Sequence, residues 1–379
     1  MAIGILTSGG DAPGMNAAVR GFFRALKLQE PRREVVFFRD GYKGLAGKLD
    51  SSTDRNVDRT AIRDILHRGG TFLGTGRVRA LIPPPDDAPD RDARLRAQQD
   101  FLRVAAVNLY QLDISDLIVV GGDGSFKGAR LIADHFRDTF PERPFRVLGI
   151  PATIDNDIHG TAWTIGFDTA LNNTVSAIRN IRDTVESHKR GIILEVMGNR
   201  SGWLALQSAV AGGASVVAIP EIPASWDHDD ILRRIRAGIQ RDYRYFIVVV
   251  AEGVRTRAGR DWSRQLRHRM ENDEEIIRQL GDPMEVRINS VGHVARGGHP
   301  SALDNTLASA FGAEAASRIL SSPASTAGGA QDSMIGHDGA RTVHVPLDEV
   351  TARSPRLVSP DAAIWQLAQQ LMLNVGQPY

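Results

Sequence analysis

The sequence predicts an α/β fold built on mostly parallel sheets. Short apolar runs of strand length, at 117–120, 147–150 and 246–250, alternate with longer segments of helical periodicity such as 168–186. Strands that alternate with helices in this way form parallel βαβ units. At 379 residues, the chain is also long enough for two domains that each bury a core.

Composition excludes several classes of protein. Hydrophobic residues make up 42% of the chain and charged residues 24%, as is ordinary for a soluble enzyme. A formal net charge of +1 argues against a nucleic acid or a membrane surface bound through bulk charge, so locally placed arginines must meet any anionic ligand. The absence of cysteine excludes a disulfide framework, a thiolate nucleophile and a Cys-ligated metal. Since there is no signal-like amino terminus and no apolar run near the roughly 20 residues that span a bilayer, we expect a cytoplasmic protein.

The first elements in chain order are a strand at 3–6, the turn TSGGDAPG and a helical pattern that starts at Met15. This arrangement can aim backbone N–H groups and a helix amino terminus at a phosphate, although a tight βα turn without a ligand would read the same. Arg20, Arg24 and Lys27 form a basic stripe on that helix. The ordinary interpretation of such a stripe is a solvated face.

Two further glycine-rich segments follow. A strand at 35–38 precedes the loop 69–79, which combines four glycines with two arginines and could fold over phosphates. The strand at 117–120 runs directly into GGDGS, where Asp123 stands among glycines. A Mg²⁺–nucleotide site needs these two parts together, an oxygen ligand for a hard cation and unobstructed N–H donors. We therefore favour such a site over a bare turn at 121–125.

The segment PATIDNDIHG, at 151–160, carries the residues best suited to catalysis. It follows a predicted strand, so Asp155 and Asp157 lie where the strand ends and a loop opens. Ligands of open α/β sheets bind outside the carboxyl ends of the strands. Flanked by Thr153 and Asn156, the two carboxylates could supply a general base and a second acid that orients it or helps to hold a metal. A polar turn with Asx capping is the alternative interpretation.

The second half of the chain repeats the alternation of strands and helices. MGNRSGW follows a predicted strand at 192–196, and Glu252 follows another at 246–250, which again places a carboxylate at the end of a strand. The segment VGHVARGGHP, at 291–300 and preceded by Arg287, clusters arginine and histidine among glycines as a sugar phosphate requires. Metal binding there is less favoured, because the histidines lack a third partner at ligand spacing.

Seven motifs occur in the order and spacing of the bacterial-type 6-phosphofructokinase family: TSGGDAPGMNAAVRG, GGTFLGTGR, GGDGS, PATIDND, GFDTALN, EVMG and VGHVARGG. The chain resembles that family over nearly its whole length. The resemblance implies two Rossmann-like three-layer α/β domains with mostly parallel sheets and an active site in the cleft between them. It assigns residues 1–165 and 295–345 to a nucleotide-binding domain, and residues 166–294 and 346–379 to a sugar-phosphate-binding domain.

The family transfers a phosphoryl group from ATP to the 1-hydroxyl of fructose 6-phosphate in glycolysis, giving fructose 1,6-bisphosphate and ADP. By matching motif, Asp155 resembles the base that takes the proton of the sugar hydroxyl, Asp157 assists it, and Thr153 contacts the transferring phosphate. Asp123 matches the Mg²⁺ position. The nucleotide contacts are matched by Gly10, Arg77, Val78, Gly122, Asp123, Gly124 and Ser125. Such catalysis is mostly positioning and charge neutralisation.

The resemblance also implies an acceptor site and an oligomer. Glu252 resembles the carboxylate that binds the sugar hydroxyls, and Arg190 matches an arginine that the family supplies from a neighbouring subunit. The active site would then be complete only in a homo-oligomer, a dimer or a tetramer. The matches to the 6-phosphate site are Arg287, His293 and Arg296, and the other positions facing the acceptor are Thr153, Asp155, Met197, Gly198 and Asn199.

Two positions bear on the phosphoryl donor. Family members that use pyrophosphate carry Asp where this chain has Gly124, and Lys where it has Ala152. Glycine leaves room for the α-phosphate and the nucleoside, whereas an aspartate would crowd and repel them. ATP is therefore the favoured donor.

The chain departs from the family at Asn199, where arginine is usual; an arginine follows one residue later, at Arg200. A neutral amide does not replace the charge of a guanidinium, so an acceptor such as sedoheptulose 7-phosphate stays open, as does pyrophosphate as donor. A non-catalytic nucleotide sensor is disfavoured because the aspartates and arginines of the site are present. A dehydrogenase is disfavoured because neither glycine-rich turn reads GxGxxG. Arg20, Arg24 and Arg182 match positions that bind a regulatory nucleotide in allosteric members.

Overall fold

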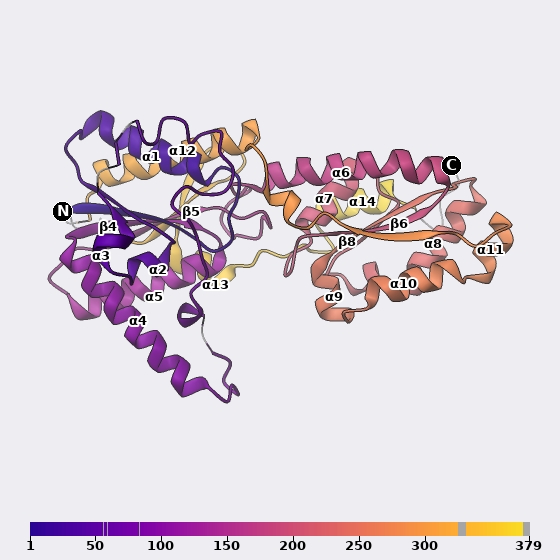
Figure 1. Ribbon diagram of the computed structural model, residues 1–379, viewed down its shortest axis with the longest axis horizontal. Coiled ribbons are helices and arrows are strands. Elements are labelled where there is room, and N and C mark those ends of the chain that lie inside the picture. Colours follow the sequence, from indigo (N-terminus) through magenta and orange to yellow (C-terminus); the bar gives the residue numbers. More distant parts are fainter. Residues whose placement is uncertain (56, 59, 83, 325–330, 374–379) are drawn as a thin grey trace. The chain divides into compact units, whose positions relative to one another are not determined.

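The structure is a computed structural model that describes residues 1–55, 57–58, 60–82, 84–324 and 331–373 (Figure 1). The chain divides into two compact units. The first, called here the amino-terminal unit, consists of Met1–Ile154, Ile158–Asp168 and Arg296–Ser354. The second, the carboxy-terminal unit, consists of Asp155–Asp157, Thr169–Ala295 and Pro355–Tyr379. The predicted domain ranges differ from these units at 155–157, 166–168, 295 and 346–354.

The amino-terminal unit contains a sheet whose seven described strands follow the order β11-β10-β5-β4-β1-β2-β3. Neighbouring strands are parallel except in the pairs β10–β11 and β2–β3, which are antiparallel. The central strands are buried along their whole length, as the near-continuous apolar runs of a parallel sheet require. The bounds are β1 Ala2–Ser8, β2 Val35–Phe38, β3 Thr53–Asp54, β4 Ile114–Gly121, β5 Arg146–Pro151, β10 Ser333–His337 and β11 Thr342–Pro346.

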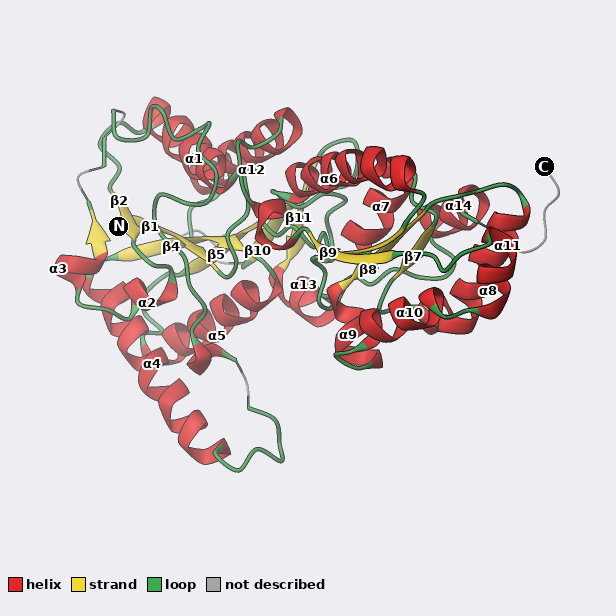
Figure 2. Ribbon diagram, turned by 45° about the vertical axis from the view of Figure 1, so that its right-hand side comes forward, coloured by secondary structure: helices red, strands yellow, loops and turns green. Residues whose placement is uncertain are grey.

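Helices cover both faces of this sheet and make three layers (Figure 2). One face carries α1 (Met15–Gln29) and α12 (Ala302–Ser321), which pack against each other. The other carries α4 (Arg91–Gln111), α5 (Asp123–Thr139) and α13 (Leu347–Arg353). Short helices in the connections are α2 Tyr42–Leu45, α3 Leu49–Ser52 and the 3-10 turn η1 Arg79–Leu81.

The carboxy-terminal unit has a smaller, fully parallel sheet in the order β7-β8-β6-β9. Its strands are β6 Gly191–Val196, β7 Val216–Ala218, β8 Phe246–Ala251 and β9 Val286–Ser290. On one face lie α6 Phe167–His188, α7 Trp203–Gly212 and α14 Ala363–Leu371, and on the other α8 His228–Gln240, α9 Glu252–Ala258 and α10 Trp262–Glu271. The remaining pieces are α11 Glu274–Leu280 and the 3-10 turns η2 Pro223–Trp226 and η3 Gly292–Arg296.

These two units confirm the predicted α/β fold with mostly parallel sheets. Each has its own core, formed in one case around Leu117, Val119 and Phe126 and in the other around Val248 and Phe246. Within the described part of the chain, no helix combines the length and the apolar character that crossing a membrane would require.

Candidate active site

The turn between β1 and α1 lies against an arginine from a distant part of the chain. Arg296 donates from Nη1 to the carbonyl oxygen of Asp11 at 2.9 Å. A Cβ at Gly10 would lie 3.0 Å from the same Nη1. The predicted nucleotide residue Gly10 and the predicted phosphate ligand Arg296 therefore meet within the amino-terminal unit.

The GGDGS turn joins β4 to α5, and glycine is required at its first position. A Cβ at Gly121 would lie 2.5 Å from both the Ser125 hydroxyl oxygen and the Ser8 carbonyl oxygen. By contrast, a Cβ placed at Gly124 would meet no described atom within 4 Å outside its own neighbours along the helix. The turn thus packs tightly on the protein at one end and faces open space at Gly124, where a ligand can approach the backbone.

The side chain of Ser125 indicates that this turn is a ligand-binding site as well as the start of a helix. The residue is 4% exposed, yet among the described residues its hydroxyl has no hydrogen-bond partner. Buried hydroxyls are nearly always hydrogen-bonded, so an orphan of this kind calls for a ligand or an ordered water. A hydroxyl and unpaired N–H groups at a helix amino terminus are the donors that a phosphate accepts from.

The loop 69–79 is hydrogen-bonded to the turn between β1 and α1. Thr75 donates from its hydroxyl to the carbonyl oxygen of Gly9 at 3.0 Å, which ties the loop to the first glycine turn. A Cβ at Gly9 would lie 3.1 Å from the Ser125 hydroxyl oxygen. The structure therefore places the first glycine turn against both Ser125 and the loop that carries Arg77 and Val78, with Arg77 exposed to solvent.

Tyr42 supports this region and was missed in the sequence. Its hydroxyl donates to the carbonyl oxygen of Ser125 at 2.5 Å, across 83 residues of chain. Complete burial raises the pKa of Tyr42 far above its ordinary value, so the hydroxyl stays a donor. A tyrosine after a glycine carries no local signal of such a contact.

Asp123 is the first residue of α5, at the carboxyl end of β4. Its Oδ2 pairs with Lys127 Nζ at 2.8 Å, one helical turn along the chain, and its side chain is 13% exposed. Thr153 lies beside this turn, because a Cβ at Gly122 would be 3.6 Å from the Thr153 Cβ. Asp123 and Thr153 thus share the edge of the sheet where β4 and β5 end.

The tripeptide Asp155–Asp157 belongs to the carboxy-terminal unit. Asn156 is 3% exposed and has φ of 49°, the left-handed region that L residues other than Asn and Asp seldom adopt. Asp157 is 9% exposed, whereas Asp155 is only partly buried. The first aspartate of the motif is therefore the more accessible to a substrate.

Met197, Gly198 and Asn199 follow β6, and Glu252 begins α9 directly after β8. The two segments touch, since Gly253 donates from its N–H to the Gly198 carbonyl oxygen at 3.0 Å. A Cβ at Gly253 would lie 2.1 Å from the Asn199 carbonyl oxygen, so only glycine fits there. These acceptor candidates therefore gather at the carboxyl edge of the parallel sheet, as predicted for ligand sites.

Arg190 and Arg287 lie at the opposite edge of that sheet. Arg190 precedes β6, Arg287 pairs in register with Ile192 at its start, and both guanidinium groups form ion pairs with Glu285. At about 3.3 Å per residue, a six-residue strand such as β6 separates the two edges by about 17 Å. The structure does not bring these arginines near Met197 or Glu252 of the same chain. His293 is exposed in η3, and Asn199 and Arg200 are exposed as well.

Comparison with known proteins identifies the chain's relatives. A family model described as phosphofructokinase matches residues 2–319. A Brevibacillus brevis protein named ATP-dependent 6-phosphofructokinase is 39% identical over 372 residues, covering 98% of this chain and 99% of that protein. The chain belongs to the phosphofructokinase family.

Solved phosphofructokinases have the same fold. The chain matches Pichia pastoris phosphofructokinase with a TM-score of 0.76 and 30% identity over 98% of its length, and it spans 37% of that longer chain. A pyrophosphate-dependent phosphofructokinase from Marinobacter aquaeolei gives a TM-score of 0.74 over 100% of this chain and 93% of that one. At 20% identity, the second match supports the shared fold alone.

The carboxylates near the GGDGS turn include one residue, Asp123, with the chemistry to hold a cation. The described residues contain no cluster of three or more His, Cys, Asp or Glu side chains that could hold a metal ion. Mg²⁺ needs no such cluster, because it keeps several waters and binds through one or two carboxylates plus substrate phosphates. Asp123, beside the orphan hydroxyl of Ser125, fits that pattern.

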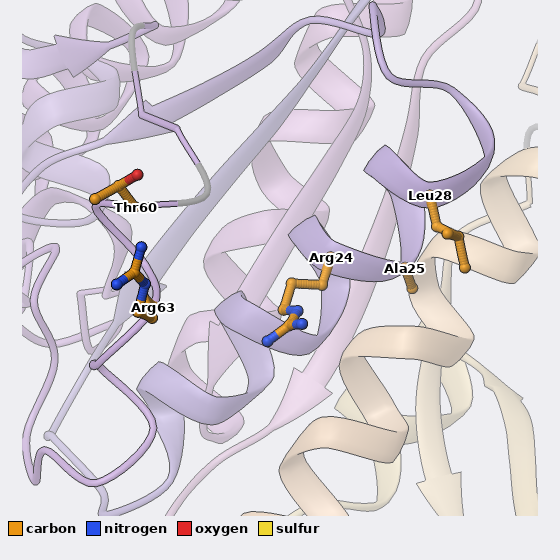
Figure 3. A pocket seen from close by; sticks show the side chains of 5 residues that line it. All are labelled: Arg24, Ala25, Leu28, Thr60 and Arg63. Atoms are coloured by element: carbon orange, nitrogen blue, oxygen red, sulfur yellow. The ribbon is translucent and has the colours of Figure 1, made fainter.

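The basic stripe on α1 borders a cavity of about 440 Å³, lined by Arg24, Ala25, Leu28, Thr60 and Arg63 (Figure 3). Arg20 lies on the same stripe and donates from Nε to the Arg63 carbonyl oxygen at 3.3 Å. Burial, and then the like charge of Arg24, lower the pKa of Arg20. Arg182, which resembles a regulatory position of phosphofructokinases, lies in the other unit and donates to the carbonyl oxygens of Gly212 and Gly213. In this chain, the guanidinium of Arg182 caps the end of α7.

Proposed function

We propose that this chain is an ATP-dependent 6-phosphofructokinase, which converts ATP and fructose 6-phosphate into ADP and fructose 1,6-bisphosphate. The observation that carries the proposal is the turn at Ser125, where a buried orphan hydroxyl and the open position of Gly124 stand beside Asp123. The relatives that share about 39% of the sequence and carry this name support it.

The glycine turns bind the phosphates of the donor. Gly10, Gly122, Gly124 and Ser125 offer N–H and hydroxyl donors, and Arg77 reaches over them from the loop 69–79. Asp123 would hold Mg²⁺, which neutralises the charge of the phosphates as the phosphoryl group moves. The position of Asp123 at the start of α5 holds this carboxylate in place, and Lys127 pairs with it one helical turn along the chain.

Asp155 takes the proton from the 1-hydroxyl of the sugar, so that its oxygen can attack the transferring phosphoryl group. Its partial exposure leaves it accessible, and the more buried Asp157 assists it from the same turn. Thr153 contacts the transferring phosphate. A transition state of the metaphosphate type asks mainly for alignment and charge neutralisation, which these short side chains on strand ends provide.

The acceptor is bound at the carboxyl edge of the smaller sheet. Glu252 accepts hydrogen bonds from the sugar hydroxyls, and Met197, Gly198 and Asn199 pack beside it. His293 and Arg296 meet the 6-phosphate. Asn199 brings no charge to this site, so an acceptor such as sedoheptulose 7-phosphate is the main alternative.

Arg190 and Arg287 serve the 6-phosphate of a second copy of the chain. They stand about 17 Å along the strand direction from Met197 and Glu252, too far to bind the same sugar phosphate as these two residues. An oligomer, a dimer or tetramer, would bring this edge to a neighbour's sugar. Sedimentation of the purified chain should give an oligomer, and mixing inactive Arg190→Ala and Asp155→Asn chains should restore some activity in hybrids.

The cavity beside Arg24 and Arg63 favours a second function, regulation by a phosphate-bearing effector. Two arginines that line a cavity of about 440 Å³ can bind the phosphates of a nucleoside diphosphate. We also infer that the enzyme works in the cytoplasm on free metabolites, with no nucleic acid or membrane partner.

A steady-state assay tests the function directly. ATP and pyrophosphate, each with Mg²⁺, are crossed against fructose 6-phosphate and sedoheptulose 7-phosphate. Efficient turnover with ATP and fructose 6-phosphate is expected. If only sedoheptulose 7-phosphate is phosphorylated, it is the acceptor, and Asn199 is the first residue to examine. If substrates bind but no pair is turned over, the chain is better explained as a nucleotide sensor.

A further inference from the structure

The turn that carries the two aspartates is held by side chains from elsewhere in the carboxy-terminal unit. Ser201 donates from Oγ to the carbonyl oxygen of Asp155 at 3.0 Å. Arg356 donates from Nη2 to the carbonyl oxygen of Asn156 at 3.0 Å, and from its backbone N–H to that of Asp157 at 2.6 Å. Two residues thus hold three consecutive carbonyl groups.

Arg356 is itself fixed in place. Its guanidinium lies over the ring of Trp203, 4.9 Å from the centroid, and the indole N–H of Trp203 donates to the Arg356 carbonyl oxygen at 2.9 Å. Glu221 accepts with Oε1 from the N–H groups of Gly202 at 2.8 Å and Val358 at 3.1 Å. This carboxylate ties the segment after β6 to the segment before α14, so the two holding residues cannot move independently.

The conformation of the middle residue of the turn explains why these hydrogen bonds matter for the two aspartates. Asn156 is left-handed, a conformation that persists where the surroundings determine it. The direction of each Cα–Cβ bond follows from the backbone. Holding the carbonyl groups on both sides of Asn156 therefore fixes the directions in which Asp155 and Asp157 point.

Charge adds a second effect. Burial lowers the pKa of the Arg356 guanidinium, and the negative charge of Asp157 opposes that shift. A cation beside a carboxylate favours its ionised form. Ser201, buried and neutral, can contribute only geometry.

We propose that Arg356, assisted by Ser201, is a positioning residue for the catalytic base, holding the turn so that the Asp155 carboxylate is aligned when the sugar binds. The proposal rests on the proposed function, because it takes Asp155 as the base. Nothing in the reaction requires Arg356 to touch either substrate.

The test compares Arg356→Met with Arg356→Lys. Methionine removes the cation and the donor while keeping most of the stem, so kcat should fall by roughly 10–10²-fold, the effect of a misplaced reacting group. The KM values for both substrates should change little. The acid limb of the kcat profile should move to higher pH in Arg356→Met, because loss of the cation raises the pKa of Asp157, which assists the base from the same turn. Lysine keeps the charge and should return the limb to its wild-type position while restoring kcat only in part.

Arg353→Met is the matched control, since Arg353 lies three residues earlier and forms an exposed pair with Glu349. The same change there should leave kcat and the pH profile alone. If Arg356→Met behaves like this control, or loses activity only in proportion to its thermal unfolding with an unshifted acid limb, the proposal is wrong. If Arg356→Met does not fold, Arg356→Lys and Ser201→Ala provide the test instead. Wild-type kcat in both of these variants would also show that the proposal is wrong.

Asp155→Asn, assayed alongside, separates the positioning role of Arg356 from the proposed function on which it rests, in which Asp155 is the base. If Asp155→Asn retains turnover, Asp155 is not the base, and the positioning role of Arg356 is then wrong as well. An inactive Asp155→Asn beside a normal Arg356→Met would leave the base in place and defeat the positioning role alone.

Discussion

Two neighbouring strands, β4 and β5, end in loops that carry aspartates, and the two loops are held in different ways. Gly121 and Pro151 pair in register, so both loops start from the same edge of one sheet. Asp123 is fixed locally, by a helix start and by Lys127 four residues on. The Asp155–Asp157 turn is fixed from outside, by Ser201 and Arg356, which are 46 and 200 residues from the carbonyls they hold.

The difference follows from what each loop is proposed to do. A metal ligand needs an oxygen held in place, and at a helix start the backbone already provides that order. A base must point its carboxylate at one hydroxyl, and a turn with a left-handed residue does not by itself supply that order. The reacting turn therefore depends on distant contacts, and the binding turn on local ones.

Asp155→Asn should produce the largest effect. Removing the proton acceptor lowers kcat by roughly 10²–10⁴-fold, the usual contribution of general base catalysis, while binding of fructose 6-phosphate stays largely intact. Steady-state kinetics and equilibrium binding of the sugar measure the two halves of this statement. Near-normal turnover would show that the turn carries no base.

Gly124→Asp tests the local loop at the position that faces open space. Because a Cβ there would meet no described atom within 4 Å outside its own neighbours along the helix, the variant should fold with an unchanged melting temperature. The added carboxylate should repel the nucleotide phosphates and lower kcat/KM for ATP by at least about 10-fold, which corresponds to about 1.4 kcal/mol. Gly124→Ala, which adds volume without charge, is the control. Unchanged ATP kinetics in Gly124→Asp would refute the donor argument.

Ser125→Ala separates binding from stability in the same loop. The buried hydroxyl has no described partner, so its removal should leave the free energy of unfolding unchanged or slightly raised. ATP should bind more weakly, by the roughly 0.5–1.5 kcal/mol of one lost hydrogen bond. A drop in stability without any change in ATP affinity would mean that Ser125 has a structural partner and not a ligand.

The same contrast explains what the sequence predicted. Asp123 and Asp155 could be found because a buried apolar run followed at once by a polar turn is a local pattern. Tyr42, Ser201 and Arg356 could not, because each acts through a contact across 46 to 200 residues, and nothing in the local sequence marks it.

Among the elements that the sequence did not predict, β9 and α4 were missed for related reasons. β9 reads VRINS, and only Val286 in it is buried, so it lacks the apolar run by which the other strands were recognised. The amphipathic pattern of α4 is weak, with charged residues through its first half. The placement of Arg287 at the far edge of the sheet depends on the register of β9, which the motif match did not contain.

Lys127→Met should produce the smallest effect, and it tests whether the binding loop really is held by its own backbone. An i,i+4 pair on a helix contributes about 0.3–0.5 kcal/mol, and the Lys127 side chain is 37% exposed, which weakens the pair further. The free energy of unfolding should therefore change by less than about 0.5 kcal/mol. kcat should stay close to wild type, because the helix start keeps Asp123 in place without its partner. A large loss of kcat would mean that Asp123, like the reacting turn, depends on a side chain to hold it, and the contrast between the two loops would disappear.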